Sequence, residues 1–155
     1  MTLDDIRDVF EHSPWVAERA WQDDGFHSID ELHAAMMAVV REASREEQLA
    51  LVRAHPELAG AEAVAGRLTP ASSGEQGRLG FDRMPGGELD KMRQLNKGYR
   101  EKFGFPCIVA LRLHASRDSV LAEMQRRLRN TPETELANAL DQIGHIARGR
   151  LDKLA

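Results

Sequence analysis

The sequence places an imidazole directly before a proline, at His55-Pro56. Because proline disfavours the α conformation of the residue before it, we expect the preceding helix to end at or just before His55. A helix C-terminus favours the charged imidazolium, and the pKa of a histidine is easily moved across neutrality. His55 is therefore a candidate for proton transfer, although a histidine that only caps a helix is the simpler interpretation of the local sequence.

Two further groups of polar side chains could act with a histidine. Glu75 could accept hydrogen bonds, with Ser72 and Gln76 beside it, but Ser72-x-x-Glu75 also has the pattern of a helix capping box. Arg148 and Arg150 lie next to core positions of the last predicted helix, where an arginine is commonly a solvated partner of the helix dipole. A structural role stays open for each of these residues, and the choice between the two arginines stays open as well.

Other chemistries lack their usual patterns. No two of the six histidines have i, i+4 spacing, and no His-Glu-x-x-His occurs. The single cysteine, Cys107, excludes a cysteine cluster and an intramolecular disulfide, and its apolar neighbours predict a small buried side chain. No Gly-x-Ser-x-Gly elbow and no Walker or Rossmann glycine pattern is present. We therefore expect no metal site and no phosphate loop.

Composition predicts one globular domain over residues 1–155, since 42% of the residues are hydrophobic. The formal net charge of −4 gives no electrostatic footprint for nucleic acid or for an anionic membrane. The basic residues are spread out except for Arg126, Arg127 and Arg129, which we expect to be solvated at a helix end. No apolar stretch approaches the ~20 residues of a membrane span, and no signal peptide is recognisable, so we expect a cytoplasmic protein.

Apolar spacing and capping patterns predict an all-α, single compact domain of about eight helices. We expect helices to begin at Thr2, Ser13-Pro14, Ser28, Ser44, Thr69-Pro70, Ser116 and Thr131-Pro132, with the first carrying Leu3, Ile6, Val9 and Phe10. The clearest long helix is predicted over residues 88–103, and residues 59–68 are predicted to be a loop or a weak helix. Residues 107–113 could be a buried strand or helix, and we favour helix because no partner strand is evident.

Five motifs in one order give this chain a resemblance to a known family. His55-Pro-Glu-Leu-Ala-Gly60 is similar to the His-Pro-Asp-Leu-Ala motif of the OHCU decarboxylases, which act on 2-oxo-4-hydroxy-4-carboxy-5-ureidoimidazoline in urate breakdown. The other four motifs are Phe10-Glu11-x-x-Pro14-Trp15-Val16-Ala17, Ser72-x-x-Glu75-Gln76 with Gly80-Phe81-Asp82-Arg83-Met84, Leu95-Asn96-x-x-Tyr99-x-x-Lys102-Phe103-Gly104-Phe105-Pro106, and Ile143-x-x-Ile146-Ala147-x-x-Arg150-Leu151. The likeness therefore runs over nearly the whole chain. Departures occur at Glu57, where Asp is common, at Cys107, where an aromatic residue is common, and at the bulkier Gly77-Arg78-Leu79.

The resemblance implies decarboxylation of OHCU to (S)-allantoin. Losing CO2 leaves an electron pair that the adjacent C=N of the substrate can accept, so no pyridoxal, thiamine or metal electron sink is implied, and no cofactor. The family also implies a homodimer. Two alternatives stay open, namely a decarboxylase of a related ureido compound and a helical ligand-binding module without catalysis.

The resemblance also implies roles for particular residues. His55 would be the general acid/base, with Pro56 holding its ring at the substrate site, and Glu75 would accept hydrogen bonds from substrate N–H or hydroxyl groups. Ser72 and Gln76 would complete a polar clamp. Arg150 would hold a substrate oxygen or the carboxylate with its planar fork. Ring and ureido amides would be bound by backbone groups of Ile108, Val109, Ala110 and Leu111.

Overall fold

The protein is described by a computed structural model of residues 1–155, apart from the side chains of Glu62 and Val64. Over the described chain it consists of helices and irregular segments without strands, which confirms the all-α prediction. The helices are α1 (Leu3–Ile6), α2 (Trp15–Ala20), α3 (Ile29–Glu42), α4 (Arg45–Arg53), α5 (Ala61–Val64), α6 (Pro70–Arg78), α7 (Gly86–Phe103), the 3-10 helix η1 (Leu111–Leu113), α8 (Arg117–Arg127) and α9 (Pro132–Leu154). None of them is long and apolar enough to cross a membrane.

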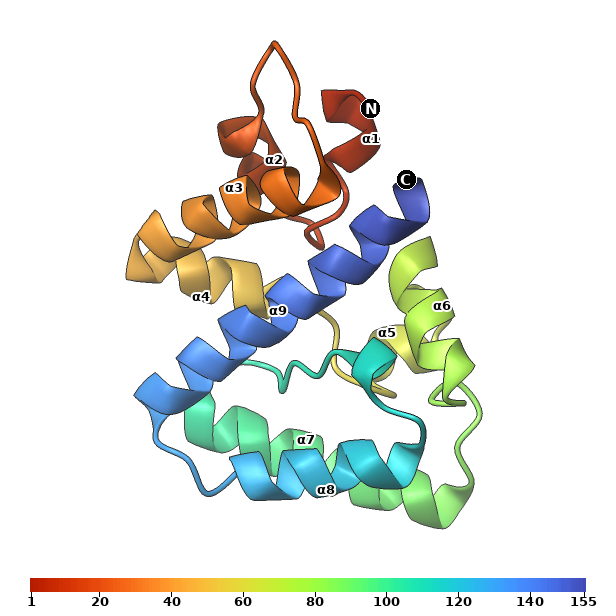
Figure 1. The fold of residues 1–155 in the computed structure, drawn as a ribbon. Coiled ribbons are helices and arrows are strands. Elements are labelled where there is room, and N and C mark those ends of the chain that lie inside the picture. The colour runs from red at the N-terminus through yellow and green to blue at the C-terminus, as the bar shows by residue number, and fades with distance from the viewer.

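Helix α9 is the central element of the fold. It lies between the N-terminal helices α1–α4 and the pair α7 and α8, and it contacts α3, α4, α7 and η1 (Figure 1). Its buried side chains recur at helical spacing and include Leu136, Ala139, Ile143, Ala147 and Leu151. Because these positions follow the 3.6-residue period, one face of α9 faces the core along most of its length.

Most helix starts follow from local capping chemistry, as predicted. Ser44 and Glu47 form a reciprocal capping box at the start of α4. Thr69, Ser116 and Thr131 each accept a hydrogen bond from the backbone N–H three residues further on. Helix α4 ends at Arg53 with Ala54 as its C-cap, so His55 lies just past a helix end, as Pro56 predicts.

The first helix is shorter than predicted. It ends at Ile6, whereas the apolar spacing suggested that it would continue through Phe10. Val9 and Phe10 are still buried, but they lie in turns closed by hydrogen bonds from Val9 N–H to Ile6 C=O and from Ser13 N–H to Phe10 C=O. Burial of these turns, rather than helix propensity, decides the local structure, and it directs the next side chain, Glu11, into the interior.

The prediction of a helix over residues 107–113 is wrong. The chain is extended and irregular through residue 110, and only Leu111–Leu113 form a 3-10 turn. Buried backbone groups need partners, and here side chains from other helices supply them. Arg127 donates to the Ile108 carbonyl, Arg78 donates to the Leu111 carbonyl, and the Ala110 N–H donates to Gln142 Oε1 at 2.9 Å.

The expectation of a solvated end for α8 is also wrong at one residue. Arg126 is exposed, but the side chain of Arg127 is only 4% exposed and forms an ion pair with the fully buried Glu135. Adjacent arginines on a helix point in different directions. Arg126 pairs on the outer side with Glu123 of its own helix, whereas Arg127 meets Glu135 of α9 on the inner side.

Candidate active site

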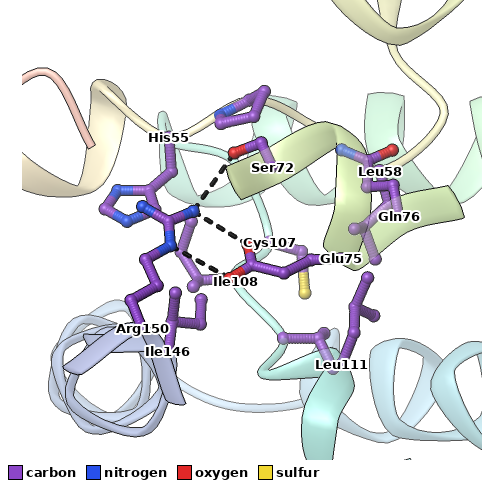
Figure 2. A pocket seen from close by; sticks show the side chains of 12 residues that line it. His55, Leu58, Ser72, Glu75, Gln76, Cys107, Ile108, Leu111, Ile146 and Arg150 are labelled. Atoms are coloured by element: carbon purple, nitrogen blue, oxygen red, sulfur yellow. Dashed lines mark hydrogen bonds and ion pairs between the residues drawn. The ribbon is translucent and has the colours of Figure 1, made fainter. Parts of the chain in front are cut away.

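A small cavity of about 40 Å³ collects side chains from four separate parts of the chain. It is lined by His55, Pro56, Leu58, Ser72, Glu75, Gln76, Cys107, Ile108, Val109, Leu111, Ile146 and Arg150 (Figure 2). The structure therefore brings together all the site residues expected from the sequence except Ala110, which is buried beside the cavity without lining it.

The ring of His55 is fixed by one hydrogen bond. Its Nδ1 lies 3.0 Å from the carbonyl oxygen of Leu51, one turn back on α4. A carbonyl oxygen only accepts hydrogen bonds, so in the neutral ring Nδ1 carries the proton and Nε2 bears a lone pair. Nε2 has no hydrogen-bond partner among the described residues, which leaves it available to take or return a proton.

His55 is neutral at physiological pH. Burial lowers its pKa from 6.5 to about 4, and the nearby charge of Arg150 adds to this, while the hydrogen bond to Leu51 and the charge of Glu11 oppose it. The expectation that a helix C-terminus would favour the imidazolium at this position is therefore wrong. The free energy of removing the ring from water exceeds what a helix end contributes.

This shift predicts a pH dependence of stability. Between about pH 6.5 and pH 4 the unfolded chain binds a proton at His55 that the folded chain does not, so the free energy of unfolding should fall as pH falls through this window. Because of His55, the free energy of unfolding should be about 2 kcal/mol lower at pH 5 than at pH 7. Urea denaturation at both pH values should show this loss in the wild type and not in His55→Gln. Equal losses in both proteins would contradict the neutral, buried state of the ring.

Arg150 makes polar contacts with four other residues around the cavity. Its Nε and Nη2 bind the two carboxylate oxygens of Glu75 at 3.0 and 2.8 Å, and Nη1 donates to the Val9 carbonyl at 3.2 Å. Nη2 also lies 2.9 Å from Glu11 Oε2 and 3.3 Å from the Ser72 hydroxyl. Figure 2 shows the guanidinium facing Glu75 and Ser72, with the ring of His55 beside it.

Arg148, the other arginine left open by the sequence, points away from the cavity. It pairs with Asp30 and with Asp152, and its side chain is 34% exposed. Arg150, two residues later on α9, is 7% exposed. A shift of two residues rotates a side chain by more than half a turn around a helix, which explains why the two differ.

Glu11 is a member of the cluster that the sequence did not single out. Its side chain is 1% exposed, and it accepts hydrogen bonds from Ser72 Oγ at 2.6 Å and from Arg150. Burial alone would raise the pKa of Glu11, but the hydroxyls of Ser72 and Thr69 and the charge of Arg150 together lower it, so it stays ionised. The sequence feature that could have indicated Glu11 as a site residue is its place beside the apolar Phe10, inside one of the family motifs.

Ser72 and Gln76 make contacts within the protein that the sequence did not predict. The N-cap of α6 is Thr69, so Ser72 lies inside the helix and its capping-box interpretation is wrong. Gln76 accepts the Ala59 N–H at 3.0 Å and donates to the Glu57 carbonyl at 3.3 Å. It therefore braces the loop after His55, where Ala59 has a positive φ of 51°.

Two of the three departures from the family pattern lie outside the cavity lining. Glu57 pairs with Arg100, and Arg78 binds the carbonyls of Leu111 and His114. Cys107 does line the cavity, and it is buried as predicted. Burial raises the pKa of its thiol to about 12, so it is a protonated apolar neighbour rather than a nucleophile.

Fold and site together define a small helical domain with a buried histidine, a bidentate arginine and carboxylates around one cavity. A family model described as OHCU decarboxylase matches residues 2–152, and the chain belongs to this family. It is 41% identical over 149 residues to the 2-oxo-4-hydroxy-4-carboxy-5-ureidoimidazoline decarboxylase of Haloferax volcanii, covering 96% of this chain and 86% of that protein.

Two solved structures have the same fold. A crystal structure of (S)-allantoin synthase aligns with a TM-score of 0.75 at 32% identity, over 97% of this chain and 48% of that one. A crystal structure of an OHCU decarboxylase in the presence of (S)-allantoin aligns with a TM-score of 0.75 over 97% and 96% of the two chains. At 22% identity, this second likeness concerns the fold alone.

Proposed function

We propose that this protein decarboxylates OHCU to (S)-allantoin. The observation that carries the proposal is the meeting of His55, Glu75 and Arg150 at one cavity, in a chain that belongs to the OHCU decarboxylase family. We further propose that residues 1–155 act as one functional domain, as a homodimer in the cytoplasm, with no nucleic acid as partner.

The reaction requires the protein to position the substrate and to transfer protons to and from it. The bond between the carboxylate and the hydroxyl-bearing carbon breaks, and its electron pair moves toward the neighbouring carbon and its C=N nitrogen. The hydroxyl then gives up its proton to become the carbonyl of allantoin, and the neighbouring carbon gains a proton. The former C=N nitrogen takes up one further proton from water, so one proton is consumed for each CO2 released. Delivery of that proton on one face sets the S configuration, so a positioned acid/base is the main requirement.

His55 fits this role through its tautomer. A neutral ring with a bare Nε2 can take the hydroxyl proton as CO2 leaves, and the resulting imidazolium can return a proton to the neighbouring carbon. The Leu51 carbonyl holds Nδ1–H throughout, and the fixed φ of Pro56 limits movement of the backbone. A low pKa makes the ring a weak base before substrate binds, and it makes the imidazolium a strong proton donor afterwards.

Arg150 and Glu75 would bind the polar groups of the substrate. The cavity of about 40 Å³ is smaller than the about 300 Å³ or more of common small-molecule sites. We therefore infer that Glu75, the more exposed of the two carboxylate partners of Arg150, exchanges that contact for substrate N–H or hydroxyl groups. Glu11 remains buried against Arg150, so the guanidinium keeps one counterion while its fork binds a substrate oxygen.

Fewer backbone groups are available to the substrate than the sequence suggested. The Ile108 carbonyl, the Ala110 N–H and the Leu111 carbonyl already bind side chains. The groups without a hydrogen-bond partner among the described residues are the N–H of Ile108, both groups of Val109 and the N–H of Leu111. A donor and acceptor pair at Val109 is complementary to the N–H and C=O of a ureido or ring amide.

The test is turnover of freshly generated OHCU, followed as CO2 release and as circular dichroism of the allantoin formed. We expect rapid appearance of one enantiomer, well above the slow spontaneous decay of OHCU. Related ureido and imidazoline compounds should be turned over more slowly. A protein that binds OHCU without accelerating CO2 release would instead be a ligand-binding module, and faster turnover of a related compound would reassign the substrate.

A further inference from the structure

Residues 106–110 have no regular secondary structure, and Cys107, Ile108 and Val109 among them line the cavity. Cys107, Ile108, Val109 and Ala110 are each at most 4% exposed, so the backbone they share is deep in the protein. An irregular buried segment lacks the internal hydrogen bonds that fix a helix or a sheet, and its geometry must be set by contacts from outside.

Arg127 of α8 holds this segment through the Ile108 carbonyl. The guanidinium itself is fixed by Glu135, which lies 2.8 Å from Arg127 Nε and is fully buried. Glu135 accepts three more hydrogen bonds, from Tyr99 Oη at 2.6 Å, Asn130 Nδ2 at 2.8 Å and Asn138 Nδ2 at 2.7 Å. Burial alone would raise the pKa of Glu135, but these donors and Arg127 together lower it, so the carboxylate stays charged.

The hydrogen-bond network around Glu135 is better explained by its effect on the position of the cavity wall than by a contribution to the stability of the fold. A buried ion pair gains little over apolar side chains of the same volume, because both charges lose their hydration. Arg127 also has a buried Nη2 without a hydrogen-bond partner among the described atoms, which adds to that cost. What the network does supply is a fixed location for one carbonyl of the cavity wall.

Gln142 of α9 holds the same segment from a second side. Its Oε1 accepts the Ala110 N–H at 2.9 Å, two residues after the carbonyl that Arg127 binds. With residues 108 and 110 held on both sides, the backbone between them cannot rotate freely. Both polar groups of Val109 lie there without a hydrogen-bond partner among the described residues, next to the cavity.

We propose that Arg127 and Gln142 are positioning residues, which hold Ile108 and Ala110 so that the backbone of Val109 is presented to the amide groups of the substrate. This rests on the proposed function for the identity of the substrate. Neither residue touches the cavity, so each acts through the backbone it holds. The contact made by Val109 lies away from the reacting carbon, so its loss should weaken binding more than it slows chemistry.

The first test is Arg127→Lys, with Arg126→Lys as its control. Lysine keeps the charge and can reach Glu135 or the Ile108 carbonyl, but it lacks the fork that spans both. We expect the KM for OHCU to rise about tenfold with kcat within about twofold, as for loss of one or two hydrogen bonds. Arg126 is 65% exposed beside Glu123, so its replacement should change neither value.

The second test is Gln142→Ala with Gln142→Glu, which keeps an acceptor oxygen. The alanine variant should raise KM about threefold to tenfold, and the glutamate variant should return it to near the wild-type value. Hydrogen exchange should accelerate in a peptide spanning residues 105–113 in Arg127→Lys and Gln142→Ala, while the Tm of Gln142→Ala stays within a few degrees.

The results distinguish the positioning role from the proposed function. If Gln142→Ala, or a folded Arg127→Lys, keeps the KM of the wild type, the positioning role is overturned. If Arg127→Lys does not fold, the comparison of Gln142→Ala with Gln142→Glu decides the question. A fall in kcat at unchanged KM also overturns it. If the wild type itself fails to turn over OHCU, the proposed function fails, while faster exchange in residues 105–113 would still show that these side chains hold the segment.

Discussion

Replacement of His55 by glutamine is expected to lower kcat for OHCU decarboxylation by about a thousandfold, within the range of about 10² to 10⁴ typical of general acid/base groups. Glutamine retains a polar side chain of similar reach, but it cannot take up and return a proton. Because His55 Nε2 is the one ring nitrogen not bound to the backbone, no other atom of this residue can do so. The KM should change much less than kcat.

The control for this variant is His145→Gln, which changes an exposed histidine on α9. Far-ultraviolet circular dichroism and Tm should show that both variants fold at pH 7, where the buried ring is neutral. Residual allantoin from His55→Gln should also lose its enantiomeric excess, since the proton would then arrive from solvent on either face. A folded His55→Gln protein with the wild-type kcat would remove His55 from the mechanism.

Replacement of Arg150 by lysine is expected to raise the KM for OHCU by about 10-fold to 100-fold, which corresponds to about 1.4 to 2.8 kcal/mol of lost binding. Lysine preserves the positive charge beside Glu11, but its single nitrogen cannot reproduce the planar fork that now spans both oxygens of Glu75. Arg148→Lys, two residues away on the surface, should leave KM within about twofold.

Replacement of Arg150 by alanine should have a second effect, on stability. Glu11 would keep its burial and lose its counterion, and breaking a buried pair in this way costs about 3–5 kcal/mol. The double variant Glu11→Gln/Arg150→Ala should recover part of that loss, because it removes the unpaired charge. If Arg148→Lys raises KM and Arg150→Lys does not, the substrate contact has been assigned to the wrong arginine.

Features set by local backbone chemistry could be predicted from the sequence. Pro56 determines where α4 must end, and Ser44, Thr69, Ser116 and Thr131 act on backbone groups within their own first turn. Nine of the twelve residues that line the cavity were also expected, but through the family resemblance, since their local patterns left structural roles open.

Features set by tertiary contacts could not be predicted in this way. The sequence shows that Glu11 and Arg127 are charged, but not that each meets an opposite charge from a distant part of the chain inside the core. The pKa of His55 likewise depends on burial, which reverses the effect expected from a helix end. Residues 107–113 escaped prediction because side chains from α6, α8 and α9 replace the internal hydrogen bonds of a helix.

The mechanism places the reacting molecule at the cavity between His55, Glu75 and Arg150. A crystal structure of the protein with (S)-allantoin would show whether it binds there. We predict the product in this cavity, with His55 Nε2 within hydrogen-bond distance of the carbonyl oxygen or of the carbon that gained the proton. We also predict the Arg150 fork on a product oxygen and Val109 on an amide. Product bound elsewhere, or bound here with His55 turned away from those atoms, would contradict the assignment.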